Sequence, residues 1–161
     1  MMRRSGIKIM AQLIGLIAPL MHVMILAITT GVLGFLCAIS ITILGGYAIL
    51  TFLGLNNFFT IKTIFITVLV LAALRGLLHY IEQLSNHFIA FKLLALIRDK
   101  VFKALRKLSP AKLEGRDKGN LIALITSDIE LLEVFYAHTI SPIAIGVLTS
   151  IIMTIFIGSF N

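Results

Sequence analysis

The sequence predicts an all-α, polytopic membrane protein with three long transmembrane helices. Hydrophobic residues make up 59% of the 161 residues, charged residues make up 13%, and the mean hydropathy is +1.06. Soluble domains, by contrast, are about 45–50% apolar and about 25% charged. Three apolar stretches each exceed the roughly 20 residues that cross a bilayer, and one polar stretch, residues 94–120, separates the second from the third.

The placement of basic residues predicts the orientation in the membrane. Three precede the first apolar stretch and nine lie between Lys92 and Lys118, whereas residues 55–60 carry none. Because cytoplasmic segments collect Lys and Arg, we expect the N-terminus and the polar stretch in the cytoplasm. The same placement accounts for the pI of about 9.9. We therefore expect the lipid bilayer as a partner and no nucleic acid.

The first expected span covers residues 20–55, which are nearly free of charge. Before it, residues 1–18 are basic and weakly amphipathic. They form either an interfacial lead-in or a frayed extension of the span, and the sequence leaves both open. After it, Asn56-Asn57 favours a tight turn on the far side of the membrane.

The second expected span covers residues 60–108, where no Gly–Pro break occurs. At 1.5 Å per residue such a helix is about 70 Å long, against a hydrocarbon core of about 30 Å. Roughly half of it must therefore extend into the cytoplasm. There, apolar residues recur at three- and four-residue steps, which predicts an amphipathic helix. These residues are Leu94, Ile97, Val101, Leu105 and Leu108.

A short exposed helix is expected over residues 109–116. Ser109 suits the N-cap, and Pro110 suits the first helical position because its missing N–H would be unpaired there anyway. Gly115 ends this helix after little more than one turn. The two long helices on either side therefore meet at a small cytoplasmic tip.

The third expected span covers residues 119–161 and also begins in the cytoplasm. Ser127 and Glu130 have the spacing of a capping box, which allows a break, but we expect a continuous helix with a kink at Pro142. Small residues recur at every fourth position in this span and in the first, which lets another helix approach closely. These residues are Thr30, Gly34, Ala38, Thr42, Gly46, Gly146, Ser150, Thr154 and Gly158.

Three polar residues of the second span form the candidate site. Arg75, His79 and Glu82 are spaced by four and three residues, so they share one helix face inside the membrane. Charged residues there are costly and face a cavity or a partner. They either line a pathway for a polar, charged solute, or form a structural network in which Arg75 pairs with an acidic group and Glu82 reaches the interface. We find no catalytic residues, phosphate loop or metal-binding spacing.

Long helices that meet in the cytoplasm at a short transverse helix resemble the first half of the transmembrane domain of ABC exporters. The segment KALRKLSPAKLEGRDKGNLIALITSDIELLEVFYAHTISPI is more specific. It resembles the CydC-type subunit of the heterodimeric cysteine/glutathione exporter needed for cytochrome bd assembly. The preceding RGLLHYIEQLSNHFIAFKLLALIR also fits, through Arg75, Tyr80, Glu82, Leu84, His87, Phe91 and Arg98. The likeness covers about residues 75–143, and upstream only a generic span is recognisable.

The resemblance implies that residues 109–116 are the first coupling helix, which docks on an ATPase domain. The expected docking residues are Ser109, Pro110, Lys112, Leu113, Glu114 and Arg116. It further implies the bacterial inner membrane, a second subunit in a heterodimer, a small thiol substrate, and a nucleotide-binding domain with ATP and Mg²⁺. Spans 4–6 and that domain are absent from the 161 residues. We therefore expect a fragment or truncated product that is not itself an enzyme and holds no ATP.

Haem is a further implication of the resemblance. Members of the family associate with haem, and His87 matches the histidine implicated there as a ligand. Gln83 departs from the pattern, because the family has a basic residue at that position that suits a haem propionate. From the residues alone, a single His at the inner interface is a surface or packing residue. The residues also allow another class of protein, a membrane scaffold or sensor whose cytoplasmic stalk docks a partner without moving a solute.

Overall fold

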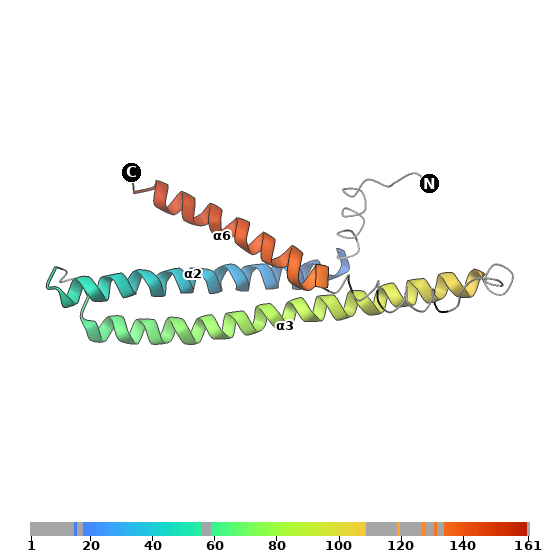
Figure 1. Ribbon diagram of the computed structural model, residues 1–161, viewed down its shortest axis with the longest axis horizontal. Helices are drawn as coiled ribbons and strands as arrows, with labels where there is room; N and C mark the ends of the chain where they lie inside the picture. The colour runs from blue at the N-terminus through green and yellow to red at the C-terminus, as the bar shows by residue number, and fades with distance from the viewer. Residues whose placement is uncertain are drawn as a thin grey trace. The chain divides into compact units, whose positions relative to one another are not determined.

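The computed structural model describes residues 15, 18–55, 59–108, 119, 127, 131 and 134–160, and these residues contain helices and turns but no strand (Figure 1). Three of the helices are long and apolar enough to cross a membrane, which confirms the predicted all-α membrane fold. The elements in chain order are the 3-10 helix η1 (Ala18–Leu20), α2 (Met21–Phe52), α3 (Ile61–Leu108), the π-helix η3 (Tyr136–Ile140) and α6 (Ser141–Gly158). The expected coupling helix, residues 109–116, lies outside the described residues.

Polar side chains within the apolar helices bond to their own backbone. The Thr30 hydroxyl donates to the carbonyl of Leu26 at 2.8 Å, and the Ser40 hydroxyl donates to the carbonyl of Leu36 at 2.9 Å. The hydroxyls of Thr42, Thr51, Thr67 and Thr154 make the same bond four residues back. Polar groups in lipid must be satisfied internally, so these hydroxyls add little cost to membrane insertion.

Helix α2 ends at a glycine that the sequence analysis did not single out. Gly54 has φ +73°, a left-handed conformation that favours glycine. Around it, the N–H of Leu55 donates to the carbonyl of Leu50 at 3.0 Å, and the N–H of Gly54 donates to the carbonyl of Thr51 at 3.1 Å. This pair of bonds is a Schellman motif, which satisfies the last carbonyls of the helix. The turn therefore starts before the expected Asn56-Asn57, which lies outside the described residues.

Helix α3 is a single helix of 48 residues, about 70 Å long. Its length is more than twice the thickness of a hydrocarbon core of about 30 Å. Gly76, about a third of the way along it, does not interrupt it. The helix therefore provides both a membrane span and an extension of similar length.

The chain forms two compact units. Unit 1 consists of Met1–Ile25 and Ser85–Ser141, and unit 2 consists of Leu26–Leu84 and Pro142–Asn161. In unit 1, the second half of α3 buries Ile89, Ala90 and Leu93. Further along, Leu94, Ile97, Val101 and Leu105 of the amphipathic pattern are half-buried, whereas Lys100, Lys103, Arg106 and Lys107 are exposed. One of these, Lys103, forms an ion pair with Asp99 at 2.6 Å.

Unit 2 contains most of α2, the first half of α3 and most of α6. Within it, α2 lies alongside α3 (Figure 1), and a Cβ added to Gly34 would lie 3.8 Å from the Cβ of Leu78. The outward positions are apolar and exposed, including Phe65, Leu69, Leu77, Ile155 and Phe156. An apolar exterior of this kind suits contact with lipid.

Helix α6 packs through a different face from the one the small-residue pattern indicates. Ile145 and Thr149 are buried, whereas Gly146, Ser150 and Thr154 are exposed. Ile145 and Thr149 therefore make the contacts of α6 inside unit 2. Pro142, where a kink is expected, is the second residue of α6, and the five residues of η3 directly before α6 are π-helical. Proline lacks the N–H of a regular α-helical turn and its ring clashes with the carbonyl four residues back, which accounts for irregular backbone at this point.

Candidate functional site

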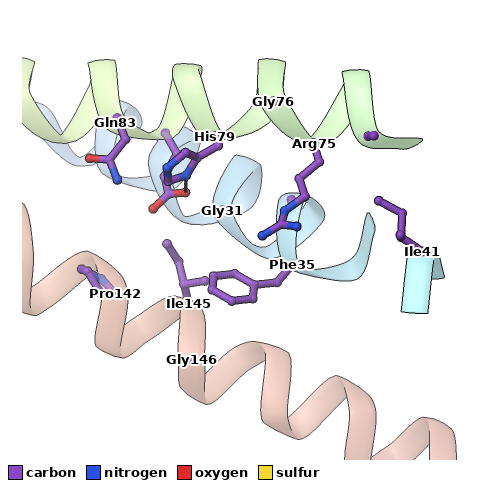
Figure 2. Close-up of a pocket in the computed structure, with 13 residues that line it drawn as sticks. Gly31, Phe35, Ile41, Arg75, Gly76, His79, Gln83, Pro142, Ile145 and Gly146 are labelled. Carbon is purple, nitrogen blue, oxygen red and sulfur yellow. Dashed lines mark hydrogen bonds and ion pairs between the residues drawn. The ribbon is translucent and has the colours of Figure 1, made fainter. Parts of the chain in front are cut away.

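The candidate site is a cavity inside unit 2 with a volume of about 590 Å³ (Figure 2). Cavities of about 300–1,000 Å³ hold small molecules. Helices α2, α3 and α6 all contribute to its wall. The lining residues are Gly31, Gly34, Phe35, Ile41, Ala72, Arg75, Gly76, His79, Glu82, Gln83, Pro142, Ile145 and Gly146.

All three residues predicted from the spacing on the second span lie at this cavity. Arg75, His79 and Glu82 follow one face of α3, because steps of four and three residues are close to one helical turn. Gln83 joins them and was not predicted as part of the site. The other lining residues are apolar or glycine, so the polar groups of the cavity come from one helix. Their role in binding or transport stays a prediction.

Glu82 is buried and bonded to His79. Its Oε2 lies 3.2 Å from Nδ1 of His79, and the Glu82 side chain is only 9% exposed, whereas that of His79 is 64% exposed. The carboxylate is therefore covered by its neighbours within unit 2, and its position relative to the membrane interface stays a prediction. Figure 2 shows the imidazole of His79 beside the cavity, with the dashed line to the carboxylate. A buried carboxylate needs hydrogen-bond donors, and His79 supplies one.

Arg75 is exposed on α3, and the described residues offer it no hydrogen-bond or ion-pair partner. The alternative in which Arg75 pairs with an acidic group is therefore not seen among the described residues. The residue lies about 20 Å along α3 from Ile61, which is inside a hydrocarbon core of about 30 Å. Insertion scales assign an arginine at the centre of a span a cost of about 2.5–3.5 kcal/mol. Figure 2 shows its side chain extending from α3 toward Phe35 of α2.

Gly31 allows the three helices to come together beside Glu82. A Cβ at this position would lie 2.9 Å from Cγ1 of Ile145 and 3.2 Å from Cδ of Glu82, and would contact Cδ1 of Ile145 still more closely. The small-residue pattern does not include this residue, because the pattern runs through Thr30 and Gly34 and Gly31 is one position away. In the sequence, Gly31 is a glycine in an apolar helix, and Gly45 and Gly46 share that property, so the sequence alone does not distinguish it from them.

A second, apolar cavity of about 360 Å³ also lies in unit 2. It is lined by Ile28, Thr29, Val32, Leu33, Leu36, Leu148 and Ile152. No charged side chain reaches it, so it offers no group that could recognise a polar solute.

His87, the haem ligand implied by the family resemblance, lies in unit 1. Its ring stacks on Phe91 with centroids 6.0 Å apart and meets the edge of His138, also with centroids 6.0 Å apart. Imidazole nitrogens suit haem iron, but neither of the two cavities is lined by His87. The ring contacts of His87 are those of a packing residue, and haem binding stays a prediction. The described residues also contain no group of three or more His, Cys, Asp or Glu that could hold a metal ion.

Haem binding is checked by the absorption spectrum of the whole transporter. Because the His87 ring contacts Phe91 and His138 and does not line either of the two cavities described above, we expect no haem band that depends on this residue. A haem band that His87→Ala removes, and that Phe91→Ala leaves in place, would contradict the packing role and restore the implied ligand.

The predicted coupling residues lie outside the described part of the chain. They are Ser109, Pro110, Lys112, Leu113, Glu114 and Arg116, and their role also stays a prediction. Only the helix that leads to them, the second half of α3, is described.

Comparison with known proteins agrees with this architecture. Residues 24–161 match the ABC transporter transmembrane region family. A "Probable ABC transporter ATP-binding/permease protein" of Haemophilus influenzae is 50% identical over 152 residues, which are 94% of this chain and 28% of that protein. The chain thus spans little more than a quarter of that relative.

More distant relatives carry a more specific name. The "Glutathione/L-cysteine transport system ATP-binding/permease protein CydC" of Haemophilus influenzae is 30% identical over 91 residues, 56% of this chain and 16% of that protein. The protein of the same name from Escherichia coli is 32% identical over 76 residues, 47% of this chain and 13% of that protein. No solved structure matches. The family match covers three membrane-spanning helices and the polar cavity between them, so the chain belongs to the ABC transporter transmembrane region family and is a multi-pass membrane protein.

Proposed function

We propose that this chain is the membrane-spanning part of an ATP-driven exporter subunit that moves a small thiol, cysteine or glutathione, as needed for cytochrome bd assembly. The observation that carries the transport role is the polar cavity of unit 2, where Arg75, His79 and Gln83 line a space inside a membrane-spanning bundle. The thiol substrate is supported by the two CydC relatives, which are named for glutathione and L-cysteine. A scaffold or sensor is not favoured, because it has no need of such a cavity.

The energy source in this proposal is a nucleotide-binding domain. The relative that is 50% identical is named as an ATP-binding/permease protein, and the chain covers 28% of it. We place the coupling helix at residues 109–116, at the tip of α3. The proposal also includes a second subunit in a heterodimer, the bacterial inner membrane, and a cytoplasmic N-terminus, which the basic residues of positions 1–8 support.

The coupling helix provides the test of this function. Leu113 is its apolar anchor, surrounded by the charged residues Lys112, Glu114 and Arg116, and small interfaces of this kind depend on such a central residue. We expect Leu113→Asp in the whole transporter to leave membrane insertion intact and to lower both substrate-stimulated ATP hydrolysis and thiol uptake by about tenfold or more, since a hot-spot loss exceeds about 2 kcal/mol. Both are measured in inverted membrane vesicles.

The control is Lys107→Ala, which removes an exposed basic side chain at the end of α3 and should keep wild-type coupling. Normal coupling in the Leu113→Asp variant would show that residues 109–116 are only a turn. Wild-type vesicles that take up neither cysteine nor glutathione, yet hydrolyse ATP in response to another solute, would reject the thiol substrate and retain the exporter.

A further inference from the structure

One positive charge in unit 2, that of Arg75, has no anionic partner among the described residues. The sequence of this unit, residues 26–84 and 142–161, contains a single acidic residue, Glu82, and two basic residues, Lys62 and Arg75. Glu82 is already bonded to His79 and its side chain is 9% exposed. Lys62 lies next to the first residue of α3, at the end of the span, where a long side chain can reach water. Arg75 is therefore the charge that needs an anion from outside the unit.

Glu82 cannot serve as that anion. Among the described residues no ion pair joins it to Arg75, and its carboxylate is bonded to His79 instead. The carboxylate carbon of Glu82 also lies close to Gly31 of α2, because a Cβ added to Gly31 would be only 3.2 Å from it. The two charged groups of the cavity thus differ in accessibility: the carboxylate is covered, and the guanidinium is open.

The space around Arg75 is open and bounded by apolar groups. A Cβ added to Gly76 or to Gly146 would meet nothing within 4 Å, and both glycines line the cavity. Phe35 and Ala72 provide apolar wall on α2 and α3. At the other end of the cavity, His79 and Gln83 provide further hydrogen-bonding groups. A solute that fits has an oxyanion at one end, a small apolar body and polar groups at the other end.

We propose that Arg75 binds the oxyanion of the transported solute, a carboxylate in the first instance, and that Glu82 only positions His79. The planar guanidinium presents N–H groups in a fork that matches the two oxygens of a carboxylate. This inference rests on the proposed transport function and deepens it, because it assigns a charge class to the solute. The cavity selects anionic over cationic solutes, although it contains one residue of each charge.

The test compares anionic solutes with counterparts that lack a free carboxylate. In the whole transporter in lipid nanodiscs, we measure the unfolding temperature and the stimulation of ATP hydrolysis with cysteine against cysteamine, glutathione against its diethyl ester, and succinate and phosphate as anions without a thiol. We expect at least one anion to raise the unfolding temperature and its uncharged or cationic counterpart to leave it unchanged. Arg75→Gln should weaken apparent anion affinity by about tenfold or more, and Arg75→Lys by less, because lysine keeps the charge and loses the fork.

The matched control is Lys62→Gln, which removes one positive charge from the same helix without lining the cavity, and should retain wild-type anion affinity. The proposal is overturned if no anion of the panel raises the unfolding temperature of the wild-type protein. It is also overturned if the Arg75→Gln variant still prefers anions. If the Arg75→Gln variant does not assemble, the proposal is judged by the preference of the wild-type protein for anions and by the anion affinity of the Arg75→Lys variant. Stimulation by succinate or phosphate alone would reject the thiol substrate and leave the role of Arg75 standing.

Discussion

Replacing Gly31 with valine is expected to disrupt the packing of α2 with α3 and α6 and to lower the stability of the transporter. An added Cβ would lie 2.9 Å from Cγ1 of Ile145 and 3.2 Å from Cδ of Glu82. Neither neighbour can move away easily, because Ile145 is 1% exposed and the Glu82 carboxylate is held by His79. Inserting carbon atoms into a packed site costs about 1–3 kcal/mol, and valine adds three.

The matched control is Gly45→Val on the same helix. A Cβ at Gly45 meets nothing within 4 Å, so this variant carries the same change in helix propensity without the clash. Both are measured by unfolding the whole transporter in mixed detergent micelles with increasing SDS. Equal midpoints for the two variants would show that close approach at Gly31 does not stabilise the fold. Recovery of the Gly31→Val midpoint by a second change, Ile145→Ala, would locate the clash.

Removing the imidazole of His79 is expected to destabilise the protein more than neutralising its partner does. His79→Ala leaves the carboxylate of Glu82, 9% exposed, without the hydrogen bond at 3.2 Å. A buried polar group left unsatisfied costs about 1–3 kcal/mol, and more when it is charged. Glu82→Gln should cost less, because the amide is neutral and its oxygen can still accept from His79. The double variant should therefore be more stable than His79→Ala alone.

These four proteins form a double-mutant cycle, measured by the same SDS unfolding. The control is Tyr80→Ala, which removes a neighbouring side chain that is 64% exposed and does not line the cavity. A double variant no more stable than His79→Ala would contradict the role of His79 as the donor that stabilises Glu82. Together with the Arg75 variants, the cycle separates a residue that holds the site in place from one that contacts the solute.

Local patterns predicted the three long apolar helices of this protein. The apolar composition indicated a membrane protein, and the absence of a Gly–Pro break over residues 60–108 indicated the long helix that the structure has as α3. The spacing of Arg75, His79 and Glu82 placed them on one helix face, and they line one cavity. These predictions succeed because backbone hydrogen bonds four residues apart set the period of a helix, and that period is a property of neighbouring residues.

The sequence therefore determined by itself that the chain is a helical membrane protein with a polar group of residues on one face of its second span. Only the tertiary structure decided that Glu82 is covered and Arg75 is open, and that Gly31, outside the small-residue pattern, is the point of closest approach. Both outcomes depend on where α2 and α6 touch α3. Residues far apart in the sequence meet there, and contact energies change over a few tenths of an ångström, so no local pattern along one helix contains that information.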